Sequence, residues 1–327
     1  MMLKILKGGM LTSVQDLGRY GFQKYGVIAS GAMDPFAHRI ANLLVGNHEN
    51  AATLEISLAG PSIEFEEDAI IALCGGDLSP QLDGKECRMW RTLAVKKGCT
   101  LSFGAPKKGC RTYLAAAGGI NVPEVMHSKS TYLRAAIGGF QGRALKTGDR
   151  VPLNPVDPKR AAALLKAANS GQEWQIPAIR YFNEPVVRIM KGRQFDLFDA
   201  QSQERVFSSQ FTVGAHSDRM GYRLEGTPLS LNKAEELISE PVAFGSIQVP
   251  PDGNPIVLMA DRQTTGGYPK IGQVASIDLP LISQLNPGDK IRFKEISLDE
   301  AQKRLIAQEQ HIRQMKIGID LKMEEWK

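Results

Sequence analysis

Two stretches of this chain repeat the same order of motifs, and this repeat constrains the fold more than any other feature. FGAPKKGCRTYLAAAGG (103–119) and IQVPPDGNPIVLMADRQTTGG (247–267) each place Pro-x-x-Gly before an apolar run and end in Gly-Gly. LKTGDRV (145–151) is likewise matched by LNPGDKI (285–291), and a weaker echo joins Asp-x-x-x-Tyr at 16–20 to the same pattern further on, at 218–222. Motifs repeated in one order favour duplication of a single folding unit.

Most of the chain reads as short apolar runs bounded by Gly, Pro, Asp or Asn, as in AIIALCG (69–75). Such runs predict strands, and many strands separated by turn residues are typical of barrels or sandwiches. Three helices are also predicted: one opened by Asp34-Pro35, one over 159–169 and one opened by Ser297. We therefore expect a mainly β fold with a few helices.

The helix predicted over 159–169 follows the proline-rich VPLNPVDP and precedes Ser-Gly, which is typical of a bridge between domains. With the repeat, it predicts four parts: a first barrel domain over 1–155, a linking helix and connector over 156–180, a second barrel domain over 181–296, and a C-terminal helix and tail over 297–327. If the two domains present the same strand ends to each other, their loops meet in a cleft, where ligands usually bind.

Composition and charge exclude several classes of function. The 327 residues carry a net charge of +5 from 40 basic and 35 acidic side chains, and the basic ones are scattered, so nucleic acid is not expected as a partner. No apolar run approaches the ~18 residues of a membrane span, so we expect a cytoplasmic protein without a membrane partner. The four cysteines show no Cys-x-x-Cys spacing and no nearby His pair, which favours structural thiols over a metal site.

The loop ADRQTTGGYPK (260–270) is the strongest candidate for chemistry. Where the first copy of the repeat has Ala-Ala-Ala before its glycines, the second has polar residues from Asp261 to Thr265. A carboxylate, a guanidinium and hydroxyls beside glycines could bind a substrate or an anion. The structural alternative is an Asp-Arg pair that pins the loop.

Four further segments contain acid, base or glycine clusters. HSDRM (216–220) and SVQDLGRYG (13–21) combine Asp with Arg, and each could equally be a turn held by its Asp side chain. Ser30-Gly31 precedes a helix start whose N–H groups could hold an anion. The segment HSKSTYLRAAIGGFQGR (127–143) could cradle a phosphate or form a solvated loop.

Several absences narrow the chemistry. No GxxxxGK[ST], HExxH or Gly-x-Ser-x-Gly motif occurs, so neither a P-loop, a zinc hydrolase helix nor a nucleophile elbow is expected. Lys191 in RIMKGRQ lies beside a predicted strand, whereas a biotin-carrying lysine belongs at an exposed hairpin tip, so covalent biotin is not expected.

Long motifs of this chain resemble the allophanate hydrolase subunit 2 or KipA family. The similarity runs from about residue 3 to about residue 295 and is carried by TSVQDLGRYGFQKYGVIASGAMDPFAHRIANLLVGN, CGGDLSPQLDG, SDRMGYRL and GSIQVPPDGNPIVLMADRQTTGGYPKIG. The resemblance implies tandem cyclophilin-like β-barrels. It also implies two partners, a KipI-like B component and an A component, in an assembly that uses ATP as co-substrate to open 5-oxoproline to L-glutamate.

Site residues are inferred from the same motifs. As catalytic residues the resemblance implies Asp261, Arg262, Thr264, Thr265 and Lys270. Substrate binding is assigned to Asp218, Arg219, Gln263, Gly266, Gly267, Tyr268, Gln15, Asp16, Arg19 and Ser30, and no metal ligand is assigned.

Two other functions stay open at this point. Members of the family also include half of the carboxyltransferase domain of urea carboxylase, so the chain could be the carboxyltransferase subunit of a biotin-dependent carboxylase. Alternatively, it could be a regulatory protein that binds a KipI-like inhibitor of a histidine kinase and so relieves the inhibition.

Overall fold

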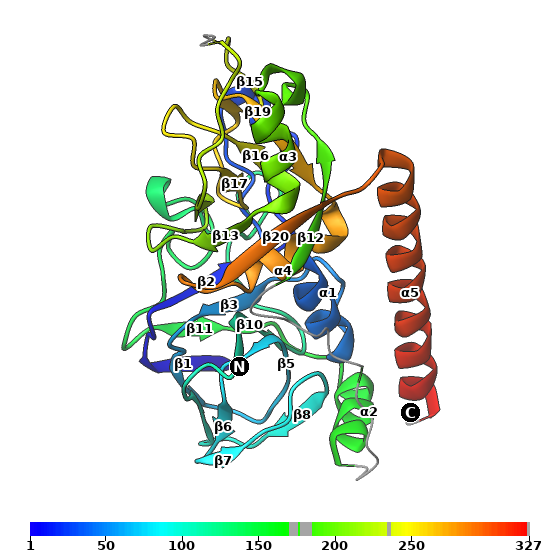
Figure 1. Ribbon diagram of the computed structural model, residues 1–327. Helices are drawn as coiled ribbons and strands as arrows, with labels where there is room; N and C mark the ends of the chain where they lie inside the picture. Colours follow the sequence, from blue (N-terminus) through cyan, green and yellow to red (C-terminus); the bar gives the residue numbers. More distant parts are fainter. Residues whose placement is uncertain (170–175, 177–184, 234–236, 326–327) are drawn as a thin grey trace. The chain divides into compact units, whose positions relative to one another are not determined.

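The computed structural model describes residues 1–169, 176, 185–233 and 237–325 (Figure 1). The chain divides into two compact units. The first unit consists of Met1–Arg19, Ser30–Arg180 and Gln310–Lys327, and the second of Tyr20–Ala29 and Tyr181–Glu309. The predicted domain bounds stay a prediction. Parts of them lie outside the described residues: 170–175 and 177–180 of the connector, 181–184 and 234–236 of the second domain, and 326–327 of the tail.

The strands of the first unit form two antiparallel sheets. One has the order β11-β1-β4-β9-β6-β7 and the other the order β2-β3-β10-β5-β8. The strands span Met2–Lys7 (β1), Leu11–Gln15 (β2), Thr53–Ser57 (β3), Ser62–Phe65 (β4), Ala69–Asp77 (β5), Pro80–Leu82 (β6), Lys85–Glu86 (β7), Thr92–Val95 (β8), Thr100–Phe103 (β9), Lys108–Ala116 (β10) and Arg150–Pro152 (β11). A short 3-10 helix, η2, spans Leu133–Ala135.

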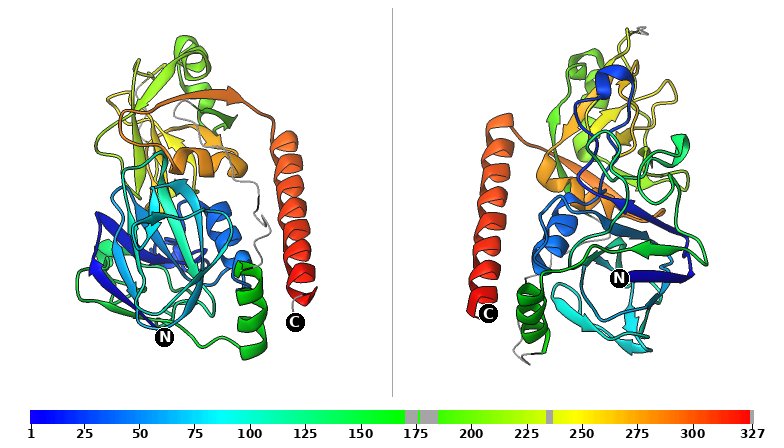
Figure 2. Two further views of the ribbon diagram at one scale, coloured as in Figure 1. Left: turned by 90° about the horizontal axis from the view of Figure 1, so that it is seen from below. Right: turned by 180° about the vertical axis from the view of Figure 1, so that it is seen from behind.

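Strands β5 and β10 lie at the centre of the first unit. Eight successive residues of β5 are buried, as expected for a strand covered on both faces. One of its faces packs against helix α1 (Pro35–Leu44), visible in both views of Figure 2. The Asp34 carboxylate caps that helix by accepting a hydrogen bond from Ala37 N at 2.9 Å. This confirms the helix start predicted from Asp34-Pro35, and helix α2 (Pro158–Asn169) also lies where it was predicted.

The second unit contains a closed barrel, with the strand order β12-β19-β16-β17-β14-β13-β20 in the described residues. Its strands span Val186–Lys191 (β12), Gln210–Val213 (β13), Gly221–Glu225 (β14), Ser246–Gln248 (β16), Ile256–Leu258 (β17), Lys270–Val274 (β19) and Lys290–Glu295 (β20). The barrel closes through the parallel pair β12–β20. Beside the barrel, a two-stranded sheet joins β15 (Glu240–Pro241) to β18 (Thr265–Gly266).

Every second side chain of a strand points into the barrel and fills its interior. In β20 the residues Ile291 and Phe293 are buried while their neighbours are exposed, because successive side chains of a strand point to opposite faces. The rings of Phe211 and Phe293 lie 5.8 Å apart.

The remaining elements are η1 (Gln23–Tyr25), η3 (Phe195–Leu197), α3 (Ala200–Ser208), η4 (Ser276–Asp278) and α4 (Leu279–Ser283). Figure 2 (right) shows the blue segment that contains η1 beside strands of the second unit.

Helix α5 (Leu298–Glu325) ends the described chain. Ser297 Oγ accepts a hydrogen bond from Glu300 N at 3.2 Å, as the predicted capping residue should. Although α5 has 28 residues, neither it nor another helix within the described ranges combines the length and apolarity needed to cross a membrane.

The duplicated turns have matching geometry. In LKTGDRV the Asp149 carboxylate accepts a hydrogen bond from Lys146 N at 2.8 Å, and in LNPGDKI the Asp289 carboxylate accepts one from Asn286 N at 2.7 Å. The preceding glycines, Gly148 and Gly288, both have φ of 92°, a left-handed value that glycine adopts without strain. The two copies of this motif therefore form the same turn. The predicted mainly β fold with a few helices is confirmed.

Candidate functional site

The Asp261 carboxylate of the second unit is bound by Arg219. Arg219 donates from Nε to Asp261 Oδ2 and from Nη2 to Oδ1, both at 2.9 Å. The two side chains are only 6% and 5% exposed. Strand pairing brings them together: β14 pairs with β17 in antiparallel register, and Asp261 N donates to Arg219 O at 2.8 Å beyond the strand ends.

This bidentate pair changes the interpretation of the loop. The carboxylate of Asp261 is fixed by two charge-assisted hydrogen bonds, so the Asp-Arg pair predicted as the structural alternative is present, with Arg219 in place of Arg262. The neighbouring Asp218 is exposed, and its Oδ1 accepts hydrogen bonds from Met220 N at 2.8 Å and Gly221 N at 3.2 Å. That is the polar turn weighed for HSDRM, and binding of substrate by Asp218 stays a prediction.

Arg262 lies in a different environment from Arg219. Its guanidinium is partly buried above the Phe244 ring, 5.6 Å from the ring centroid. Nε donates to Val242 O at 3.4 Å and Nη1 to Met259 O at 3.3 Å, both long for hydrogen bonds. Burial lowers the pKa of Arg262, and the electrostatic influence of Tyr20 and of the Asp261 carboxylate opposes this effect. In the part of the chain that the structure describes, no carboxylate forms an ion pair with Arg262.

Lys270 belongs to a polar cluster at the start of β19. Its Nζ forms an ion pair with Glu240 Oε1, whose carboxylate also accepts hydrogen bonds from Gln194 Nε2 at 2.7 Å and Arg193 Nη1 at 3.1 Å. The hydrogen bond from Lys270 lowers the pKa of Glu240. Glu240 and Gln194 had no sequence signal, because each is a single polar residue outside any recognisable motif.

The middle of the loop is only partly enclosed. Gln263 and Thr265 are exposed, Thr264 is half-buried, and Thr264 O accepts a hydrogen bond from Val242 N at 3.1 Å. A side chain at position 266 would displace the Gln248 amide, since a Cβ atom there would lie 2.5 Å from Gln248 Nε2. These residues shape the loop, and their catalytic roles stay predictions.

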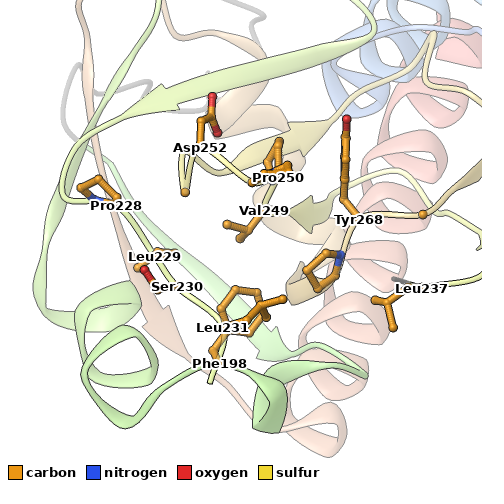
Figure 3. Close-up of a pocket in the computed structure, with 14 residues that line it drawn as sticks. Phe198, Pro228, Leu229, Ser230, Leu231, Leu237, Val249, Pro250, Asp252 and Tyr268 are labelled. Atoms are coloured by element: carbon orange, nitrogen blue, oxygen red, sulfur yellow. The ribbon is translucent and has the colours of Figure 1, made fainter. Parts of the chain in front are cut away.

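The end of the loop lines a cavity of about 640 Å³ in the second unit (Figure 3). Gly267, Tyr268 and Pro269 are among the residues that line it. In Figure 3 the Phe198 and Leu231 side chains lie at one end, and the Asp252 carboxylate and Tyr268 hydroxyl lie toward the other. The loop that carries Asp261 and Arg262 thus also contributes to an apolar cavity with a polar rim.

The polar cluster predicted in the first unit is centred on Asp16. This buried carboxylate accepts hydrogen bonds from Ser128 Oγ at 2.8 Å, Ser130 Oγ at 2.5 Å, Lys129 N at 2.6 Å and Gly18 N at 2.8 Å. The segment considered as a phosphate cradle therefore binds a carboxylate of its own chain. Since these contacts hold two distant segments together, they have a structural role.

The remaining predicted residues of the first unit are buried beside this cluster. Arg19 donates to Val125 O at 2.9 Å and to Ser130 O at 2.8 Å. Gln15 Nε2 donates to Ser13 Oγ at 3.0 Å and to Thr131 O at 3.2 Å. Ser30 has φ of 55°, which is uncommon outside glycine. Gln15 Oε1 and Ser30 Oγ are buried without a hydrogen-bond partner among the described residues.

Comparison with known proteins shows which family this chain belongs to. Residues 25–295 match the family described as carboxyltransferase domain, subdomain A and B. The chain belongs to this carboxyltransferase family. It is 41% identical to the C component of the 5-oxoprolinase of Escherichia coli K12, over 96% of this chain and 97% of that protein, and 36% identical to the protein of the same name from Haemophilus influenzae, over 98% and 100%.

Solved structures support the same family. The urea amidolyase of K. lactis matches with a TM-score of 0.82 and 30% identity, covering 100% of this chain and 20% of that one. The chain therefore corresponds to one part of that longer protein. The resemblance predicted from the motifs is confirmed at the level of this family.

The range of residues that matches the carboxyltransferase family contains only part of the predicted site. It includes Ser30, the Asp218–Arg219 dipeptide and the whole loop 260–270, and it leaves out the predicted residues before position 25. Within the described ranges, His, Cys, Asp and Glu side chains do not gather in threes as a metal site would need. Which residues bind substrate, and the predicted cleft between the two barrels, stay predictions.

Proposed function

We propose that this chain is the C component of an ATP-dependent 5-oxoprolinase, a complex that opens 5-oxoproline to L-glutamate. The observation that carries the proposal is the full-length match to two proteins named as this component, at 41% and 36% identity. The match to the urea amidolyase of Saccharomyces cerevisiae, at 33% identity, covers only 17% of that protein. A chain that matches a whole component of a complex supports the role of that component.

The proposed reaction breaks the ring C–N bond of a lactam. ATP would phosphorylate the lactam oxygen and leave as ADP, and water would attack the activated carbon. The ring nitrogen would then leave as the amine, and a second water would hydrolyse the resulting acyl phosphate to glutamate and inorganic phosphate. A KipI-like B component and an A component would complete the assembly, in the cytoplasm. We propose no metal ligand and no covalent biotin on this chain.

The loop 260–270 is the part of this chain that we place at the reacting complex. Asp261 positions the loop through Arg219, because both carboxylate oxygens already accept hydrogen bonds from that guanidinium. Arg262 adds a second guanidinium near the Asp261 carboxylate, whose two oxygens already accept hydrogen bonds from Arg219. Lys270, held by Glu240, supplies a second cation on the same loop.

Reconstitution tests the proposal. The chain would be co-purified with candidate A and B components, and glutamate release from 5-oxoproline would be measured with ATP and without it. We expect release that requires ATP and all three chains. Equal release from the two other components without this chain would contradict the proposal.

A second candidate function is carboxyl transfer, which is favoured by the family description and by the urea amidolyase structure. In this case the chain would act with a biotinylated carrier and a biotin carboxylase. Transfer of labelled carboxylate from such a carrier to urea, with no glutamate release from 5-oxoproline, would favour this candidate over the first.

A further inference from the structure

The cavity of about 640 Å³ in the second unit has the size of a small-molecule site and an apolar interior (Figure 3). Phe198, Leu229 and Val249 line it and are 0%, 2% and 4% exposed. Leu231 and Pro269 add further apolar surface. An apolar group that enters this cavity leaves water, which is favourable in proportion to the area buried.

One end of the cavity is polar. In Figure 3 the Asp252 carboxylate and the Tyr268 hydroxyl lie toward this end. The Phe198 and Leu231 side chains lie at the other. Asp252 is the charged residue of the described lining, which contains no lysine, arginine or histidine. The polar end therefore favours a cation over an anion.

The Asp252 carboxylate is oriented by its own turn and keeps an oxygen for a ligand. Its Oδ1 accepts a hydrogen bond from Asn254 N at 3.0 Å. The same turn is closed by a hydrogen bond from Gly253 N to Pro250 O at 2.9 Å. Over the ranges that the structure describes, no lysine or arginine forms an ion pair with Asp252. Its charge is therefore fixed in place without being neutralised by a cation of the described chain.

We propose that this cavity binds a small amine, that is, a protonated amino group on an apolar body. The ammonium donates hydrogen bonds to Asp252 Oδ2 and to the Tyr268 hydroxyl oxygen, and the apolar body packs against Phe198 and Leu231. The site goes beyond the proposed function, because 5-oxoproline and ATP are both anions and the Asp252 charge disfavours them. Since Asp252 is exposed, its ion pair with an amine contributes only modestly to the affinity.

Calorimetric titration of the full chain with hexylamine, 1-hexanol and heptanoate tests the site. These three molecules share a hexyl chain and differ in the charge of the end group. We expect hexylamine to bind about threefold or more tightly than 1-hexanol, and heptanoate to bind most weakly. Pentylamine should bind about fourfold more weakly than hexylamine, which is the effect of one buried methylene. Equal binding of hexylamine and heptanoate, or no binding of hexylamine, would overturn the proposal.

A change at the polar end separates charge from shape. Asp252→Asn keeps a side-chain oxygen that accepts from Asn254 N, and it removes the charge. It should weaken hexylamine binding about threefold and leave 1-hexanol binding unchanged. The matched control is Asp299→Asn, at an α5 side chain that is 74% exposed, and it should change neither. No loss with Asp252→Asn, or an equal loss with Asp299→Asn, would show that the amine does not bind at Asp252.

A change at the apolar end locates the body of the ligand. Leu231→Trp adds bulk at that end and should weaken binding of both hexylamine and 1-hexanol about tenfold. Leu321→Trp, at an α5 side chain that is 58% exposed, is the control. Thermal unfolding of each variant checks that the fold is retained, and Asp252→Asn tests the site independently of this change. Unchanged binding by folded Leu231→Trp would place the ligand outside the cavity.

The complex with the partner components separates two sources of the same chemistry. A lysine side chain of a partner carries an ammonium on an apolar stem, as a free amine does. We expect the complex to bind hexylamine as tightly as the isolated chain does. Loss of binding on assembly would mean that a partner chain occupies the cavity, and it would overturn a site for free amines. Because binding is the readout, the result does not depend on whether the complex releases glutamate.

Discussion

Asp16 in the first unit and Asp261 in the second are both buried carboxylates, yet different donors satisfy them. Asp16 is surrounded by two serine hydroxyls and two backbone N–H groups, which carry no net charge. Asp261 is bound by a guanidinium, which neutralises it. The second unit then places another arginine, Arg262, directly after that aspartate. These two buried carboxylates are therefore satisfied in different ways, and of the two only Asp261 has a charged partner among the described residues.

The largest effect expected is from breaking the charged pair of the second unit. Arg219→Met leaves the Asp261 carboxylate buried without its counterion and should lower the free energy of unfolding by about 3–5 kcal/mol. Urea unfolding of the full chain would measure it. Replacing both residues, as Arg219→Met with Asp261→Leu, should be less destabilising than the single change.

Controls for this prediction come from an exposed ion pair. Lys303 and Asp299 on α5 are more than 70% exposed, so Lys303→Met should cost less than about 1 kcal/mol. A loss for Arg219→Met as small as that for Lys303→Met would contradict the structural role of the buried pair.

Lowering the pH should destabilise the first unit, because the unfolded chain binds a proton at His38 more readily than the folded chain does. This side chain is fully buried beside Thr53, and burial lowers its pKa from 6.5 to about 4. Between these two values the unfolded chain binds the proton and the folded chain does not, so the free energy of unfolding falls as pH falls. The loss approaches about 3 kcal/mol at pH 4, at 1.36 kcal/mol per pKa unit.

Substitution of the histidine tests this pH dependence. His38→Gln should flatten the decline in unfolding free energy between pH 6.5 and 4, measured by urea unfolding at several pH values. His216→Gln, an exposed histidine of the second unit, is the matched control and should leave the decline unchanged. An unchanged pH profile for His38→Gln would show that other groups cause it.

A somewhat smaller effect is expected at Asp16, whose hydrogen-bond donors are uncharged. Asp16→Asn replaces one acceptor oxygen by an NH₂ group, which cannot accept the hydrogen bond from Lys129 N. The expected loss is about 1.5–3 kcal/mol in unfolding free energy. Ser128→Ala removes one donor and leaves the carboxylate in place, so it should cost less. The reverse order would mean that the hydroxyls matter more than the charge.

The smallest effect is expected at Glu240, which is 26% exposed. Glu240→Gln removes the charge that Lys270 and Arg193 contact and should cost less than about 1 kcal/mol, with a smaller loss at high salt. Unfolding measured at low and high salt would check this. A loss that is large and independent of salt would place Glu240 in a buried network like that of Asp261.

Features fixed by neighbouring residues could be predicted from the sequence. The helix start at Asp34-Pro35 and the turns at Gly148 and Gly288 depend on contacts within three residues, so the motifs were sufficient. The polar loop 260–270 was also recognised, because its sister in the repeat lacks the same polar groups.

The partners of the site residues could not be predicted in this way. Asp261 and Arg219 are 42 residues apart and meet because β14 pairs with β17, and no motif states that register. Asp16 meets Ser130 across 114 residues. The short segment Tyr20–Ala29 belongs to the second unit, although the chain on either side of it belongs to the first. Long-range pairing therefore decided which charges were neutralised.

The assignment of Tyr20–Ala29 to the second unit has a consequence for synthesis of the chain. The backbone passes between the units after residues 19, 29, 180 and 309, so neither unit is a single continuous stretch. During synthesis the second unit has all its segments only after residue 309 has emerged from the ribosome, and the first unit only later still. A gene cut between the two repeats would yield a C-terminal fragment that lacks Tyr20–Ala29, a segment of its own unit.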